Sequence, residues 1–129
     1  MYAVQSLARD GIIITFRGVQ SDILWATVYG VHTSESLMRA RAAGRHAVGS
    51  VFVTDYRHAA VLLDLDGVAA LTSADLICAP GAFLVSEPQL DIFVEYAKRV
   101  LARGIVRRVF TCDALALEWA EGRAELARS

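Results

Sequence analysis

Between residues 50 and 122 the chain alternates strand-type and helix-type segments, and this order constrains the fold more than any other feature of the sequence. The strand-type segments are rich in β-branched and aromatic residues, whereas the helix-type segments show apolar residues at three- and four-residue steps. Such alternation predicts a largely parallel sheet with helices packed on it. In chain order, the expected elements are a strand at 51–57, a helix at 64–72, a strand at 81–86, a helix at 87–103, a strand at 105–111 and a helix at 112–122.

Two further strand-type segments precede this alternation. Residues 11–17 and 23–29 are separated by a short turn-like stretch, which predicts a β-hairpin. A hydroxyl at Thr33 or Ser34 can then cap a helix that runs to about His46, because it accepts from the free N–H groups of the first turn. The sequence thus predicts an antiparallel pair of strands ahead of the α/β region.

The length of 129 residues suits a single hydrophobic core. We therefore expect one domain over residues 1–122 and a short tail over residues 123–129. The expected topology depends on residues 51–63 contributing a single strand, whose turn leads into a helix begun by an aspartate carboxylate.

The hydrophobic content and the net charge of the chain indicate which kinds of partner it can bind. The hydrophobic content of 55% is high for a small soluble protein, which predicts that a partner subunit or a ligand covers part of the surface, and we expect a homo-oligomer, specifically a dimer. The formal net charge of -1 argues against a nucleic-acid partner, since such proteins carry a basic excess.

Localisation follows from three observations. No segment approaches the ~20 consecutive apolar residues of a membrane span. Residues 1–10 lack the basic start and apolar run of a secretory signal. Cys78 and Cys112 are the only cysteines and have no metal-type spacing, so we expect free thiols in a reducing cytoplasm, with no metal site and no cofactor.

The sharpest local motif is the run Asp64-Leu65-Asp66-Gly67 after an apolar segment. It resembles the first motif of haloacid-dehalogenase-type phosphatases. That resemblance implies a Mg²⁺-dependent phosphatase in which Asp64 is the nucleophile and a Mg²⁺ ligand, and Asp66 is the general acid/base. The later acidic pair of that family is missing, however. The other interpretation is that Asp64 caps a helix and Asp66 favours its positive end.

A second candidate site is the run Asp55-Tyr56-Arg57-His58, which closes the strand that begins at residue 51. Polar residues just past the carboxyl end of a strand are where α/β sheets place ligand sites. His58 can carry a proton near neutral pH, with Asp55 orienting it. The structural alternative is that Asp55 accepts loop N–H groups and Arg57 is solvated or paired.

Two further places join the candidate binding residues. Thr111 and Cys112 lie where a strand runs into a helix, and a thiol at a helix N-terminus can become a thiolate more easily. Ser86 ends an apolar strand and has capping-box spacing to Gln89, so it also begins the next helix.

With these residues placed, the chain resembles the STAS superfamily, and more narrowly its bacterial stage-II-sporulation-AA-like (STAS/Sec14-like) branch. The resemblance spans about residues 11–121. It implies a mixed sheet of four to five strands with helices mainly on one face, and a non-catalytic role in binding a protein partner or a small ligand. The motifs that carry it are YGVHTSE at 29–35, VTDYRHA at 53–59, AFLV at 82–85, and FTCDA at 110–114 followed by Glu118-Trp119.

Anti-sigma-factor antagonists of this superfamily are switched by phosphorylation of a Ser or Thr at the start of the helix after the Asp-bearing strand. If Asp55 marks that strand, residues 56–71 contain neither Ser nor Thr, so the resemblance implies a module without the usual phosphoacceptor. A second register places Asp64 at the strand end and brings Ser73 to the phosphoacceptor position.

Overall fold

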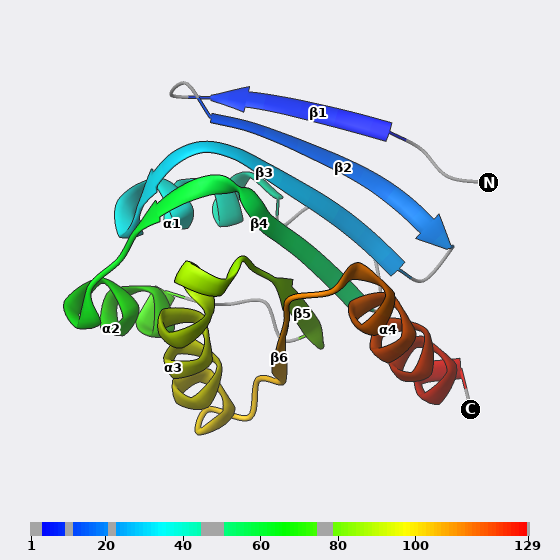
Figure 1. Ribbon diagram of the computed structural model, residues 1–129. Helices are drawn as coiled ribbons and strands as arrows, with labels where there is room; N and C mark the ends of the chain where they lie inside the picture. Colours follow the sequence, from blue (N-terminus) through cyan, green and yellow to red (C-terminus); the bar gives the residue numbers. More distant parts are fainter. Residues whose placement is uncertain (1–3, 10–11, 21–22, 45–50, 75–78, 129) are drawn as a thin grey trace.

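The computed structural model describes residues 4–9, 12–20, 23–44, 51–74 and 79–128 of the chain (Figure 1). Six strands form one sheet in the order β1-β2-β3-β4-β5-β6. The strands are β1 (Val4–Arg9), β2 (Ile12–Gln20), β3 (Ile23–Thr33), β4 (Val51–Leu62), β5 (Gly81–Leu84) and β6 (Arg107–Phe110). The helices are α1 (Ser34–Gly44), α2 (Leu65–Ala74), α3 (Leu90–Leu101), which follows a 3₁₀ turn at Glu87–Gln89, and α4 (Asp113–Arg128).

The sheet is mixed. Strands β1, β2 and β3 pair antiparallel, and β3, β4, β5 and β6 pair parallel. The predicted hairpin is present as β2 and β3, and the mixed α/β class with helices mainly on one face is confirmed. Strand β1 was not expected, because its sequence VQSLAR lacks the run of β-branched residues that identified the other strands.

The helices divide between the two faces of the sheet as the topology requires. Connections between parallel strands are right-handed in almost all proteins, and this sheet adds each strand on the same side of the previous one. The three connecting helices α1, α2 and α3 therefore share one face. Helix α4 follows the last strand, is not bound by this rule, and packs against the opposite face (Figure 1).

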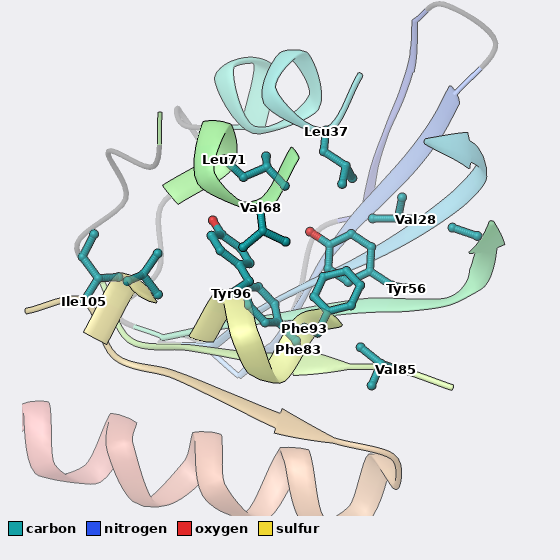
Figure 2. Close-up of a cluster of buried hydrophobic side chains, with 12 residues drawn as sticks. Val28, Leu37, Tyr56, Val68, Leu71, Phe83, Val85, Phe93, Tyr96 and Ile105 are labelled. Atoms are coloured by element: carbon teal, nitrogen blue, oxygen red, sulfur yellow. The ribbon is translucent and has the colours of Figure 1, made fainter. Parts of the chain in front are cut away.

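The core under α1, α2 and α3 is built around four aromatic rings (Figure 2). Tyr56 of β4 lies 4.7 Å from the ring centroid of Phe93, and Phe83 of β5 lies 5.4 Å from both Phe93 and Tyr96 of α3. Burying a large side chain stabilises a fold by about 1.5–3 kcal/mol, so this cluster holds the start of α3 firmly against β4 and β5.

A smaller core lies under α4. Ala116, Ala120 and Ala124 are fully buried and recur every four residues, so one narrow stripe of methyl groups faces the sheet. They pack against Trp25 of β3 and Val53 of β4, among others. Small side chains allow the helix axis to approach the strands closely.

Some element bounds differ from the expected ones. Strands β3 and β4 run four and five residues beyond the predicted ends, to Thr33 and Leu62. Helix α4 continues through Gly122 to Arg128 instead of leaving a tail, because burial of Ala124 outweighs the ~1 kcal/mol that a helical glycine costs. The expected helix end at His46 falls outside the described residues. In the described ranges, none of the helices has the length and apolar character of a membrane span.

Candidate functional site

The candidate site is built on an irregularity in the pairing of β3 and β4. Thr27 pairs with Asp55 and Tyr29 pairs with His58, so β4 has one residue more than β3 over this interval. Such a β-bulge interrupts the alternation of side chains along a strand. Asp55, Arg57 and His58 consequently all line a pocket on the face that carries α4.

The bulge lies where β5 ends. Asp55 pairs with Leu84, the last residue of β5, and beyond it β4 pairs with β3 alone. The chain enters α4 nearby, because β6 ends opposite the same residue of β5. The cluster therefore lies outside the carboxyl ends of two parallel strands, the usual place for ligand sites in α/β sheets.

Asp55 and Arg57 form a two-pronged ion pair. Arg57 Nε donates to Asp55 Oδ1 at 3.0 Å and Nη2 donates to Oδ2 at 2.9 Å. The backbone N–H of Arg57 also donates to Oδ1, at 3.0 Å. The Asp55 side chain is only 4% exposed, so these bonds replace the water that the carboxylate loses.

The remaining nitrogen of the guanidinium, Nη1, contacts the start of α4. Arg57 Nη1 donates to Oδ1 of Asp113, in the first turn of that helix, at 3.3 Å. The hydrogen bonds to Asp55 raise the pKa of Arg57 above its ordinary value. A hydrogen bond from its own backbone N–H, followed by the contact with Arg57, lowers the pKa of Asp113. Arg57 and Asp113 are thus charged at neutral pH, and their contact ties the start of α4 to the centre of β4.

His58 and Tyr29 form the open rim of the pocket. Their rings stack with centroids 5.6 Å apart and an interplanar angle of 22°. His58 Nε2 lies 4.0 Å from Asp55 Oδ2, which is too long for a hydrogen bond, and the His58 side chain is 53% exposed. The imidazole is therefore accessible to solvent and to a bound group.

The pocket has a volume of about 300 Å³ and a polar lining. Trp25 and Thr27 of β3 complete its floor beside Asp55, Arg57 and Asp113. Apart from His58, the lining carries two carboxylates and one guanidinium, which is one net formal negative charge.

An apolar surface continues from the pocket along the extended ends of β3 and β4. Val31 and Leu62 are exposed, as is Tyr29, and their strands are paired at this point. His32 and Val61, which alternate with them, are directed toward the helices of the other face. Helix α4 packs on the starts of these strands, at Trp25 and Val53, so among the described residues it leaves this part of the face exposed.

The remaining predicted binding residues lie elsewhere. Tyr56 points to the opposite face and belongs to the aromatic core. Ser86 begins the 3₁₀ turn, where its backbone N–H donates to Gln89 Oε1 at 3.0 Å. Thr111 and Cys112 are exposed just before α4, and neither lines the pocket.

Asp64 begins α2, as the capping interpretation predicts. Its Oδ1 accepts from the N–H of Gly67 at 2.7 Å, and Asp66 is exposed in the first turn. Across the described ranges, no group of three or more His, Cys, Asp or Glu side chains is arranged to hold a metal ion. The converging acids that the phosphatase alternative needs are therefore not assembled in this part of the chain.

Two features of the site were missed by sequence reasoning. Tyr29 and Asp113 line the pocket, although in the sequence they had been noted only within the motifs at 29–35 and 110–114. Gln89 had been noted only for its capping position. Its side chain also donates to the carbonyl groups of Tyr56 at 2.9 Å and Ala59 at 2.8 Å, which are backbone groups on either side of the bulge.

Comparison with known proteins shows the fold. The structure is similar to the crystal structure of an uncharacterized protein of the DUF3478 family with a SpoIIAA-like fold from Shewanella loihica PV-4, with a TM-score of 0.50 and 19% sequence identity. The alignment covers 90% of this chain and 98% of that one. No family model matches the chain, and a sequence search of curated proteins gives no match. The chain has a SpoIIAA-like fold, as its resemblance to the STAS superfamily predicted.

Proposed function

We propose that this SpoIIAA-like domain is a non-catalytic regulatory module that binds a protein partner or a small ligand at the pocket around Asp55, Arg57 and His58. The observation that carries the proposal is the bulge in β4, which gathers these side chains on one face beside the end of β5. A local irregularity that re-aims polar side chains into a pocket is typical of binding sites. The uncovered apolar surface at Val31 and Leu62 adds contact area beside it.

The charge of the pocket favours one kind of bound group. Arg57 is already engaged by Asp55 and Asp113, so its charge is balanced within the site. The 64% exposed carboxylate of Asp113 and the exposed imidazole of His58 face the opening. A positively charged hydrogen-bond donor, such as an amine or a guanidinium, complements this lining better than an anion does, and the stacked ring of Tyr29 attracts a cation as well.

Small probes test this site. In a titration followed by backbone amide NMR, we expect propylamine and propylguanidine to shift the signals of Tyr29, Asp55 and His58, and propionate to leave them in place. Asp113→Asn should weaken the response, whereas Asp66→Asn, which removes an exposed acid on α2, should not. Equal responses to propionate, or no effect of Asp113→Asn, would contradict the proposed site. Native mass spectrometry of protein taken directly from its host can then identify a co-purifying ligand.

We also propose that the module works without the phosphorylation switch of its superfamily. Helix α2 starts at Leu65 directly after β4, and acidic residues occupy its beginning, where the phosphoacceptor of that switch would stand. Ser73, the alternative acceptor, is exposed in the last turn of α2. Intact mass of the protein from its host checks this, because an added phosphate on Ser73 would contradict it.

The proposed setting is the cytoplasm, and the proposed oligomer is a homodimer without nucleic acid. The exposed thiol of Cys112 suits a reducing compartment. Self-association is supported by three large apolar side chains that are exposed: Leu62, Leu115 and Leu126. Burying such side chains against a second copy removes apolar surface from water. Sedimentation velocity over a range of protein concentrations tests it, and a monomer at every concentration would contradict it.

A further inference from the structure

A groove on the outer side of α4 carries an apolar stripe. It has a volume of about 440 Å³ and is bordered by Phe110 of the edge strand β6. Six residues of the helix line it, and four of them recur at steps of four, three and four residues: Leu115, Trp119, Gly122 and Leu126. This spacing places all four on one side of the helix, and it is the spacing of the a and d positions of a coiled coil.

The stripe is separate from the face that α4 uses inside the fold. Ala116, Ala120 and Ala124 are the residues that pack on the sheet, and they are buried. Leu115 is 55% exposed and Leu126 is 65% exposed. A surface helix needs one apolar face for its own sheet, so a second apolar stripe is unexplained by the fold of a single chain.

The two borders of the stripe carry opposite charges. Glu118, Glu121 and Glu125 are exposed along one border. On the other border, the guanidinium of Arg123 lies 5.7 Å from the ring centroid of Trp119, beside Phe110 of β6. The opposite charges of the two borders determine in which direction a second copy of the helix can pair favourably.

A twofold axis parallel to α4 brings the acidic border of one copy against the basic border of the other, which sets Glu118 beside Arg123 of the second copy. These are the g and e positions that form ion pairs between parallel helices. A perpendicular twofold axis, which makes the helices antiparallel, brings the acidic borders together instead, and like charges repel. The charge pattern therefore favours parallel pairing.

Parallel pairing leaves room for the large side chains of the stripe. Two Trp119 side chains would meet at one layer, and they need room in the next. Gly122 occupies that next layer, and a Cβ built there meets no atom within 4 Å. Leu115 and Leu126 then close the stripe at its two ends.

We propose that the α4 groove is the contact surface of a parallel homodimer, in which Leu115, Trp119, Gly122 and Leu126 meet the same residues of a second copy. The proposal rests on the self-association proposed above and adds the surface and the relative direction of the two chains. The pocket around Arg57 shares no lining residue with this groove.

Sedimentation velocity of the full chain tests the surface. We expect Leu126→Glu to shift the protein to monomer at concentrations where the unchanged protein is dimeric. The matched control is Leu101→Glu on α3, since Leu101 is 59% exposed and lies outside the groove. A dimer that survives Leu126→Glu would overturn the surface and leave self-association standing. An unchanged protein that is monomeric throughout would overturn both.

Charge-reversal variants test whether the two α4 helices pair parallel or antiparallel. In the parallel arrangement Glu118→Arg weakens the dimer, because it places two arginines together, and the double change Glu118→Arg with Arg123→Glu restores it. In the antiparallel arrangement Glu118→Arg strengthens the dimer by relieving the acidic border. A strengthened dimer would therefore overturn the parallel arrangement.

Disulfide trapping tests the relative direction of the two α4 helices independently of their charges. In a background of Cys78→Ser and Cys112→Ser, the change Leu126→Cys should form a disulfide between two identical chains, since their Cα atoms must lie within about 7 Å. Antiparallel chains would place position 126 near position 115 of the other copy, which is about 16 Å along the helix from position 126. Trapping seen only when Leu115→Cys and Leu126→Cys proteins are mixed would contradict parallel pairing. Sedimentation of each reduced variant, compared with the unchanged protein, shows that its fold and assembly are retained.

Discussion

The side-chain amide of Gln89 lies 2.9 Å from the carbonyl oxygen of Tyr56, across a gap of more than thirty residues in the chain. A second bond from the same nitrogen reaches Ala59. At this point β4 has passed the end of β5, so β5 offers no partner to its carbonyl groups on that side. Gln89 takes the place of the strand and fixes the bulge that orients the pocket.

Replacing Gln89 should therefore be costly. Gln89→Met keeps the volume and removes both donors, which leaves two buried carbonyl groups without these partners. We expect the free energy of unfolding to fall by about 2–3 kcal/mol, measured by urea denaturation. Glu87→Ala, an exposed change in the same 3₁₀ turn, should have little effect. A loss for Gln89→Met no larger than for Glu87→Ala would contradict this role.

Asp55→Asn tests the ion pair beneath the pocket. The change leaves the guanidinium of Arg57 without its main buried partner. Breaking a fully buried pair costs about 3–5 kcal/mol, and because Arg57 is 30% exposed we expect a smaller loss, of about 2 kcal/mol. Asp113→Asn should destabilise the protein less, because that carboxylate is largely exposed. Equal effects of the two changes in thermal or urea unfolding would contradict the ranking.

His32 should make stability depend on pH. It is buried at the end of β3, where its Nε2 lies 3.0 Å from the carbonyl oxygen of Tyr29, and burial lowers its pKa below the usual 6.5. Since a carbonyl only accepts, the neutral ring carries its proton on Nε2. Below pH 6.5 the unfolded chain binds a proton that the folded protein resists, so the free energy of unfolding falls as the pH decreases from 6.5 toward the folded pKa.

The comparison of His32→Gln with the unchanged protein isolates this contribution. Urea unfolding at pH 7.5 and at pH 5.5 should show a smaller loss on acidification for the variant. An NMR titration of the His32 ring should report a midpoint below that of a model peptide. A midpoint at or above the usual value would contradict the prediction.

Asp64 separates the capping role from the phosphatase role. Asp64→Ala should lower the free energy of unfolding by about 1 kcal/mol, because the N–H of Gly67 loses its acceptor. Asp64→Asn should lie within about 0.5 kcal/mol of the unchanged protein, since asparagine caps equally well. In a phosphatase assay with and without Mg²⁺, we expect no metal-dependent turnover. Turnover that needs Mg²⁺ and is abolished by Asp64→Asn would overturn the non-catalytic proposal.

Much of the architecture could be predicted from local patterns, and the reasons are physical. The helix of α3 was identified because Phe93, Ala97 and Val100 repeat at helical steps and Gly104 follows the last turn, where it has a φ of +82°. The capping role of Asp64 depends only on residues within one turn. Both features follow from interactions between near neighbours in the chain.

The site was only partly predictable because it depends on contacts between distant segments. Asp55, Arg57 and His58 were singled out as a polar run, yet the run alone does not reveal that a bulge brings His58 to the same face as Asp55 and Arg57. Gln89 lies 33 residues from Tyr56, and its role requires knowing where β5 stops. Asp113 joins the site because β6 ends opposite the last residue of β5 and α4 begins just beyond it.

The strictly sequential strand order has a consequence for how the molecule is made. Each strand lies beside the one before it, so a chain emerging from the ribosome can extend the sheet as it is synthesised. Helix α4, which follows β6, must turn back across strands already in place. Asp113 arrives with that helix, so the pocket is completed only after the whole sheet has been made, and a chain truncated before α4 would carry the sheet without a complete pocket.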